Sequence, residues 1–389
     1  MATSLADYTG QLRQFLRQEL RTTIDGVNLG TSQSRDVVAV LGREGFFAPC
    51  FRLSSTVHAG TIPLNVPFFD VLIRELAQNC PFGLTLTVAI HIGVFVPLVL
   101  RLSQGDASKT LVSEALQGNI LGGIAVTEQH VAGSDFMSME TTATLRGDGI
   151  TLQGSKHYIT NGTTADYLIV FARWRPTRNF ASYSALLVPT GLDGITRTAI
   201  PMAIMKAADI GHVDFDSVMI DRGAILGRKE LGLRYFLEHI AVERLVGGIW
   251  AVASAEQCIM ETREYAKHRL VGTGSLWERS AVRHKVAEAI ASVTLLKALV
   301  EGVESRFVHS GQIDQVDTAI IKAAVAPMME RIFGLCVQIQ GARGLELDSH
   351  MLRNLNDFRA FGIAGGATET MLDIVADRWE CDSHVVAAV

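Results

Sequence analysis

Residues 125–135 read AVTEQHVAGSD, and residues 152–162 read LQGSKHYITNG. Between them lies a β-hairpin signature: residues 141–146 alternate, Gly147-Asp148-Gly149 forms a turn signal, and the alternation resumes at residues 150–153. Alternation with a period of two predicts strands, and a glycine-rich turn predicts that two of them pair. Each quoted stretch alone is a weak signal because turns commonly contain small residues. The two stretches in this order, at the start and in the middle of a β region, are a much more specific signal than either stretch alone.

Outward from this hairpin, the spacing of hydrophobic residues changes from a period of 3.6 to a period of 2 at about residue 119, and back to 3.6 at about residue 229. Between these positions the sequence predicts further strands at residues 166–173, 183–188 and 212–220. Long runs with helical periodicity and few helix breakers follow, at residues 235–268, 281–307 and 317–340.

The order of these elements predicts three domains: a helical one over residues 1–118, a β domain over 119–228 and a helical bundle over 229–389. The fold class is therefore expected to be mainly α with a central domain of short antiparallel strands. A dinucleotide-binding Rossmann fold is not expected, because the chain lacks βαβ alternation and a GxGxxG turn after a strand.

The composition excludes several classes of protein. The 389 residues are 48% hydrophobic and carry a net charge of −5, which suits a packed core and gives no electrostatic case for nucleic acid. The five cysteines are scattered and form no CxxC, so we expect no structural metal, no disulfide framework and a cytoplasmic location. The apolar run at residues 84–100 is long enough to span a membrane, but it contains His91 and Pro97, and we expect a buried core helix.

The two quoted stretches resemble motifs of the acyl-CoA dehydrogenase flavoprotein family, which read like TEPGAGSD and GxKxxITNG. The resemblance continues through HVDFDSVMIDRGAILGR (residues 212–228), the helix containing Glu243-Arg244, the segment QIQGARG (338–344) and FGIAGGATET (361–370). It implies a helical N-terminal domain, a middle antiparallel β-barrel-like domain and a C-terminal four-helix bundle. It also implies FAD as cofactor and a homotetramer or homodimer.

The resemblance assigns residues to FAD binding. The hydroxyl groups of Thr127 and Thr160 can donate to the flavin, Ser134 can bind a phosphate, and Tyr158 can stack near the ring. The complete implied set is Val126, Thr127, Ser134, Tyr158, Thr160, Arg269, Gln338, Gly341 and Glu369. In the family, the arginine at the position of Arg269 reaches the FAD of a neighbouring subunit.

The catalytic base is the main departure from the family pattern. Many members carry the base as a glutamate in a YEGTxE-like segment, and here that position is Gly365. Isovaleryl- and long-chain-type members place the base on the long helix before an arginine, and Glu243 fits this second position. We expect Glu243 to remove the α-proton of an acyl thioester and the backbone N–H of Gly365 to hold the thioester oxygen.

Three functions remain open at this point. The first is an acyl-thioester dehydrogenase, with CoA or an acyl carrier protein as carrier and an electron acceptor flavoprotein or oxygen as oxidant. The second is a flavin-dependent monooxygenase on the same fold, for which a C-terminal base is dispensable. The third is a non-enzymatic subunit that retains only the fold. A nucleic-acid partner and a membrane are not expected.

Overall fold

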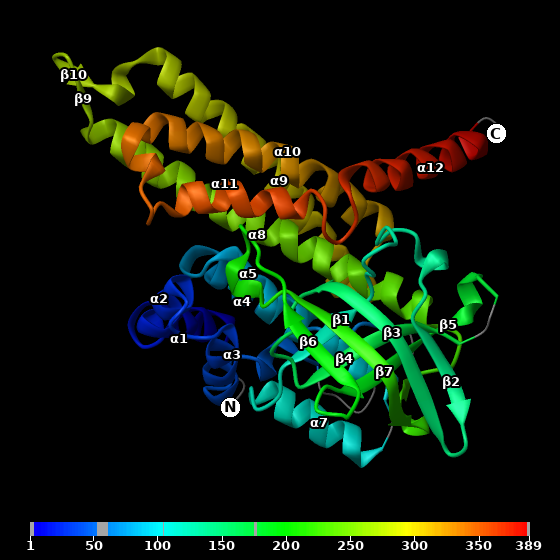
Figure 1. Cartoon of the computed structure of the whole chain (residues 1–389). Helices are drawn as coiled ribbons and strands as arrows, with labels where there is room; N and C mark the ends of the chain where they lie inside the picture. Colours follow the sequence, from blue (N-terminus) through cyan, green and yellow to red (C-terminus); the bar gives the residue numbers. More distant parts are fainter. Residues whose placement is uncertain (1–3, 53–60, 104, 175–176, 387–389) are drawn as a thin grey trace. The chain divides into compact units, whose positions relative to one another are not determined.

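The computed structural model describes residues 4–52, 61–103, 105–174 and 177–386, with side chains as far as Trp379. The chain forms two compact units (Figure 1). The first unit comprises residues 1–72 and 83–243, and the second comprises residues 73–82 and 244–389. The described part is mainly helical with one large sheet, which confirms the expected fold class. The three-domain division at residues 118 and 228 stays a prediction.

The chain begins with helices whose apolar spacing was visible in the sequence. Helix α1 (Leu5–Gln18) starts at Ser4, whose side chain accepts a hydrogen bond from the Asp7 amide. Leu12 and Leu16 recur at helical spacing and are both fully buried. The helices that follow are α2 (Arg21–Leu29), α3 (Ser34–Arg43), α4 (Val66–Asn79), α5 (Phe82–Ala89), α6 (Val96–Leu102) and α7 (Asp106–Leu116).

The apolar run at residues 84–100 is a core helix, as predicted. Phe82–Leu102 has the length and hydropathy of a membrane span, but 94% of its most apolar window is buried. A π-helical stretch, Ile90–Phe95, joins α5 to α6, and Pro97 lies in the first turn of α6. His91 is fully buried inside this stretch: its Nε2 contacts the Ala115 carbonyl at 3.0 Å, and its Nδ1 accepts from the Gly122 amide at 3.1 Å.

The first unit contains an eight-stranded sheet with the order β6-β7-β3-β2-β4-β5-β8, and β1 pairs with β4. The strands are β1 (Gly122–Ala125), β2 (Thr142–Arg146), β3 (Gly149–Ile159), β4 (Tyr167–Arg173), β5 (Tyr183–Pro189), β6 (Ile195–Ala199), β7 (Gly211–Asp221) and β8 (Ile225–Leu226). The hairpin predicted from the sequence is β2–β3, with Thr142 opposite Gln153 and Arg146 opposite Gly149. Its inward-facing apolar side chains, including Ala143, Ile150 and Leu152, belong to one buried cluster.

Two details of the sheet differ from the sequence prediction. The strands were expected to be antiparallel throughout, but β1 pairs with β4 in parallel and β2 meets β4 in parallel at Thr142 and Arg173. Parallel neighbours require a long connection, and the segment from β1 to β4, which includes the whole β2–β3 hairpin, provides it. Strand β3 also continues to Ile159 instead of ending near Gln153, so the second quoted stretch is mostly strand.

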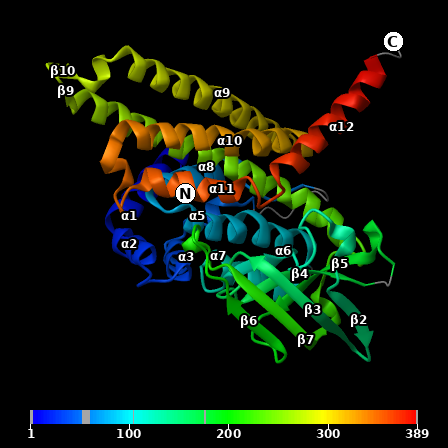
Figure 2. The ribbon, with the colours of Figure 1, turned by 45° about the horizontal axis from the view of Figure 1, so that its top comes forward.

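The second unit consists largely of long helices. They are α8 (Gly232–His268), α9 (Ser280–Ser310), α10 (Gln315–Gln340), α11 (His350–Phe361) and α12 (Thr368–Val386); α8 begins in the first unit and continues into the second. Helix α10 packs against α9, α11 and α12, and Figures 1 and 2 show α9, α10 and α11 alongside one another. Gly247 and Gly248 of α8 permit the close approach of α11 and α10, because a Cβ on Gly247 would overlap the Phe361 ring and one on Gly248 would lie 2.6 Å from Ile321.

The cysteines Cys50, Cys80, Cys258 and Cys336 are buried thiols without disulfide bonds. The side chain of Cys381 lies outside the described residues.

Candidate functional site

The turn that follows β1 brings several predicted cofactor residues next to β3. The carbonyl of Thr127 accepts a hydrogen bond from the His157 amide at 2.8 Å. The Thr127 hydroxyl lies against Gly133, where a Cβ would be 3.2 Å from it. Ser134 follows Gly133 and is exposed, whereas Asp135 accepts a hydrogen bond from the Ser138 amide and caps a short turn. The turn is therefore attached to β3 at Thr127, and Ser134, next to Gly133, is exposed on it.

The end of β3 provides an exposed aromatic side chain. Tyr158 is 56% exposed, and its φ of 59° lies in the left-handed region that non-glycine residues rarely adopt. The pairing of β3 with β7 shifts register between Lys156 and Ile159, so a bulge at this point turns Tyr158 outward. The carbonyl of Thr160 lies next to Gly123 of β1, since a Cβ on Gly123 would be 3.0 Å from it. Val126, Thr127, Tyr158 and Thr160 thus lie at the ends of β1 and β3.

A buried ion pair lies beneath this turn. Lys156 is completely buried, and its Nζ donates to Glu128 Oε1 at 2.9 Å and to the Val126 carbonyl at 2.8 Å. Burial lowers the pKa of Lys156 to about 8, although the Glu128 carboxylate opposes this shift. Burial would raise the pKa of Glu128, but Lys156 and the hydrogen bonds from Thr141 and Glu140 outweigh it and hold the pKa below its usual value. The attraction between the two groups thus opposes the effect of burial on both pKa values.

A second polar cluster on β3 and β7 was missed by the sequence analysis. His157 and His212 face each other with their Nδ1 atoms 2.7 Å apart, and His212 Nε2 lies 3.0 Å from Asp214 Oδ1. The His157 ring also makes an edge contact with Tyr158 at 4.4 Å between ring centres. The pKa of His157 is lowered by partial burial and by the nearby His212. The one sequence signal for this cluster was that His212 and Asp214 are alternate residues of a predicted strand. That signal does not identify His157 as the residue that faces them from β3.

Glu243, the predicted base, lies on α8. Of the residues 241–250, all are buried except Glu243, which is partly exposed. A carboxylate on such a helix is costly unless it is paired or functional. Glu243 is the last residue of the first unit, and Arg244 belongs to the second.

In the second unit, two cationic side chains hold the segment that contains Gly365. Arg244 donates from Nε to the Gly365 carbonyl at 3.1 Å. Lys322, which is fully buried, donates from Nζ to the Gly366 carbonyl at 2.8 Å and to the Phe361 carbonyl. Gly365 has a φ of 71°, so a side chain at this position would be strained. The loop 361–366 is therefore fixed by its carbonyl groups.

The remaining predicted cofactor residues fall into two places in the second unit, with Glu369 apart from the other three. Arg269 follows α8, and Gln338 and Gly341 lie at the end of α10; Arg343, two residues beyond Gly341, stacks over Tyr265 near the end of α8. Glu369 is in the first turn of α12, and the 12-residue helix α11, about 18 Å long, separates it in the chain from that end of α10. All four residues are exposed. One copy of the second unit does not bring them together, and their roles stay predictions.

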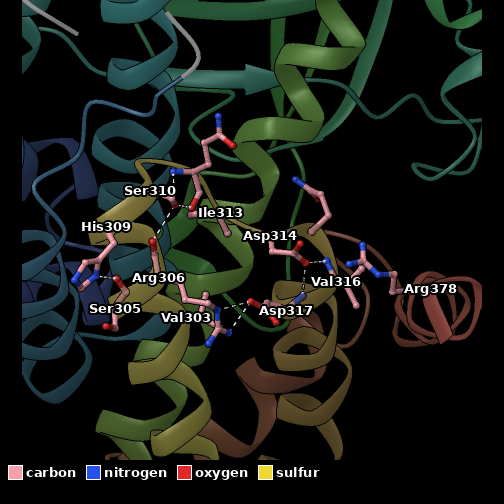
Figure 3. A pocket seen from close by; sticks show the side chains of 12 residues that line it. Val303, Ser305, Arg306, His309, Ser310, Ile313, Asp314, Val316, Asp317 and Arg378 are labelled. Carbon is pink, nitrogen blue, oxygen red and sulfur yellow. Dashed lines mark hydrogen bonds and ion pairs between the residues drawn. The ribbon is translucent and has the colours of Figure 1, made fainter. Parts of the chain in front are cut away.

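A cavity of about 890 Å³ lies at the turn between α9 and α10 (Figure 3). It is lined by Val303, Ser305, Arg306, His309, Ser310, Gln312, Ile313, Asp314, Gln315, Val316, Asp317 and Arg378. Arg306 forms an ion pair with Asp317 at 2.6 Å across its wall. Gln315, also in the wall, accepts from Arg244 Nη1 at 3.2 Å. Two hydrogen bonds therefore connect the cavity wall to Gly365.

The order of helices, sheet and helices, together with a hydroxyl-rich turn beside an exposed aromatic side chain, is typical of a class of flavin-dependent oxidoreductases. Models of the acyl-CoA dehydrogenase middle and C-terminal domains match residues 123–218 and 230–379, more than half of the chain. The chain belongs to the acyl-CoA dehydrogenase family. Family members are FAD-dependent enzymes, so the predictions of an enzyme and of FAD as its cofactor are confirmed at this level.

The relatives include enzymes that act on two kinds of thioester. The mitochondrial long-chain specific acyl-CoA dehydrogenase of Rattus norvegicus is 27% identical over 298 residues, which cover 76% of this chain and 69% of the relative. The acyl-[acyl-carrier-protein] dehydrogenase MbtN of Mycobacterium bovis is 24% identical over 326 residues, which cover 82% of this chain and 81% of the relative. The crystal structure of an acyl-CoA dehydrogenase from Geobacillus kaustophilus matches with a TM-score of 0.88 at 23% identity, over 97% of this chain and 98% of that one. This last likeness shows the fold.

Proposed function

We propose that the protein dehydrogenates an acyl thioester between its α- and β-carbons, with Glu243 as the base that removes the α-proton. The observation that carries this proposal is the placement of Glu243, the one partly exposed residue in the buried stretch 241–250 of α8. Gly365, at the family's more usual base position, has no group that can accept a proton. The similarity to a long-chain specific enzyme supports the same assignment, because the family resemblance places the base of that type on this helix.

The residues around β1 and β3 fit an FAD cofactor. The hydroxyl groups of Thr127, Ser134 and Thr160 suit the polar edge of a flavin and its phosphates. Tyr158, exposed and held outward by a bulge, suits the flat face of the ring. FAD, when bound, supplies the acceptor for the hydrogen that leaves the β-carbon as hydride.

The chain's own groups then have two tasks in the reaction. The Glu243 carboxylate takes the α-proton. The Gly365 N–H donates to the thioester oxygen, where negative charge develops as that proton leaves. The hydrogen bonds from Arg244 and Lys322 to the carbonyls of Gly365 and Gly366 keep this loop in one conformation. An N–H fixed before the reaction stabilises the charge without reorganisation at the moment of transfer.

The carrier of the acyl group is proposed to be CoA or an acyl carrier protein, and the electron acceptor a flavoprotein or oxygen. The relatives include an acyl-CoA enzyme and an acyl-carrier-protein enzyme, so both carriers stay in the proposal. The second unit exposes large apolar side chains, including Leu270, Leu295 and Leu347. They support assembly of the chain into a homotetramer or homodimer. Light scattering at micromolar concentration tests this, and a monomeric mass contradicts it.

The decisive experiment is an anaerobic titration of the purified flavoprotein with a panel of CoA and carrier-protein thioesters. Bleaching of the flavin without added reductant supports the dehydrogenase. The absence of a carboxylate at Gly365 also favours a second candidate, a flavin-dependent monooxygenase. That enzyme would show no bleaching by any thioester, and would consume oxygen only after its flavin had been reduced by another donor.

A further inference from the structure

The buried pair of Lys156 and Glu128 carries an inference that rests on the proposed FAD site. We propose that this ion pair positions the flavin-binding turn: it fixes the peptide group between Val126 and Thr127 so that the Thr127 N–H points out of the protein core, toward the flavin. Neither residue would touch the cofactor, so both are positioning residues.

Lys156 sets the direction of the peptide group between Val126 and Thr127. The Val126 carbonyl accepts from Lys156 Nζ at 2.8 Å and therefore points into the core, where Lys156 is completely buried. The described chain has no cis peptide bond, and in a trans peptide the carbonyl and the following N–H point in opposite directions. The N–H of Thr127 consequently points away from Lys156. The same lysine that holds the carbonyl thus aims a backbone donor outward.

Further hydrogen bonds on both sides of Thr127 hold this arrangement. The Thr127 carbonyl is held by the His157 amide, so the carbonyls on both sides of the Thr127 Cα are bound by consecutive residues of β3. Glu128 fixes the next residue of the turn, because its carboxylate accepts from the amides of Glu140 at 2.6 Å and Thr141 at 2.9 Å. Residue 141 immediately precedes β2. The ion pair therefore connects the turn to β2 and β3.

The ionic character of the pair has a reason beyond stability. Buried ion pairs are often replaced by apolar residues without loss of stability, so stability alone is a weak reason for one. An apolar pair of the same volume would fill the space beneath the turn. It would leave the Val126 carbonyl and the amides of residues 140 and 141 without these partners, and the turn would lose its fixed orientation. Orientation of the turn is the property that only the ionic pair provides.

The test uses the double variant Glu128→Gln/Lys156→Met, which avoids an unpaired buried charge. The single variant Glu128→Gln, which keeps shape and one acceptor, is the milder second case. The control is Arg35→Met: Arg35 pairs with Asp166 at 3.1 Å, and Asp166 holds the Leu121 amide before the start of β1, so this change breaks a half-exposed ion pair near the other end of the same strand.

Two measurements are made on each protein: the dissociation constant of FAD for the apoprotein, and amide hydrogen exchange across residues 126–141. For the double variant we expect a dissociation constant at least tenfold higher, exchange at the amides of Glu140 and Thr141, which Glu128 holds, at least tenfold faster, and an unfolding temperature close to that of wild type. Glu128→Gln should show smaller changes in the same direction, and Arg35→Met should show none. An FAD affinity within twofold of wild type in the double variant overturns the inference, and so does unchanged exchange at the amides of Glu140 and Thr141. If wild-type apoprotein does not bind FAD, the proposed function fails, while the exchange measurement still decides whether the pair orients the turn.

Discussion

The turn at residues 126–135 and the loop at residues 361–366 are both held by a buried lysine, but in different ways. Lys156 binds one carbonyl of the turn and is neutralised by Glu128, which itself binds two backbone amides. Lys322 binds two carbonyls of the loop, and a second cationic side chain, Arg244, binds a third. The turn is therefore anchored through an ion pair, and the loop through cations that bind its carbonyl oxygens.

This difference corresponds to the two tasks in the proposed function. The turn serves a cofactor that stays bound. An ion pair without net charge, which orients the Thr127 N–H group, is sufficient for this task. The loop lies at the proposed thioester oxygen, where negative charge develops during the reaction. The carbonyl oxygens of Phe361, Gly365 and Gly366 accept hydrogen bonds from cations, so their negative ends are compensated before that charge develops. Changes to the turn should therefore affect FAD affinity, and changes to the loop should affect the reaction rate.

The largest effect is expected outside both segments, at Glu243. Glu243→Gln keeps the size of the side chain and removes its basicity, so the rate of flavin reduction by an acyl thioester should fall by about 10²–10⁴-fold. FAD affinity should not change. The matched control is Glu238→Gln on the same helix; Glu238 pairs with Arg101 at 2.7 Å and is not assigned to the chemistry. Stopped-flow reduction under anaerobic conditions measures both variants, and a wild-type rate for Glu243→Gln would show that another base acts.

The next effect concerns the hydroxyl groups of the turn and of β3. In Ser134→Ala/Thr160→Ala, two hydrogen bonds to FAD are lost at about 0.5–1.5 kcal/mol each, so the dissociation constant should rise about 5- to 150-fold. Thr144→Ala, on an exposed position of β2, is the control. Fluorescence titration of apoprotein with FAD measures the constants. Equal affinity of the double variant and wild type would remove these two residues from the cofactor site.

Acid should destabilise the start of β1, because the His91 imidazole accepts the hydrogen bond from the Gly122 amide only while the imidazole is neutral. Burial lowers the pKa of His91 from 6.5 to about 4. The unfolded chain therefore binds more protons than the folded one between these values, and stability falls as the pH drops through this range. From pH 7 to pH 5 the expected loss from this group is about 2 kcal/mol.

Urea unfolding at the two pH values measures this loss. His91→Gln should be less stable at pH 7 but should lose less on acidification. His239 supplies a comparable remaining loss, since burial also lowers its pKa to about 4. An undiminished pH dependence in His91→Gln would show that His91 is not the group responsible.

The smallest expected effect tests the loop directly. Lys322→Met removes hydrogen bonds from a charged donor to the carbonyls of Phe361 and Gly366, and it should slow flavin reduction about tenfold while FAD affinity stays the same. Lys297→Met is the control, since Lys297 forms a half-exposed pair with Glu256 at 2.9 Å in the same unit. If Lys322→Met weakens FAD binding and leaves the reduction rate unchanged, the division of tasks between the two segments is wrong.

The sequence by itself determined the order of helical, β and helical regions, the β2–β3 hairpin and the long helices near their observed bounds. It also identified the family, through AVTEQHVAGSD and LQGSKHYITNG. These features are local: a period of two or 3.6 is visible within ten residues, and turn residues lie next to the strands they join.

Only the tertiary structure decided which side chains act on which backbone groups. Lys156 lies 28 residues from Glu128, and Lys322 lies 44 residues from Gly366; neither distance along the chain predicts a contact. The facing pair of His157 and His212 depends on the register of β3 against β7, and the parallel pairing of β1 with β4 depends on a connection that contains a whole hairpin. A motif gives the type of a residue, whereas a hydrogen bond requires two groups within about 3 Å, and distant segments of a chain reach that distance only in the packed fold.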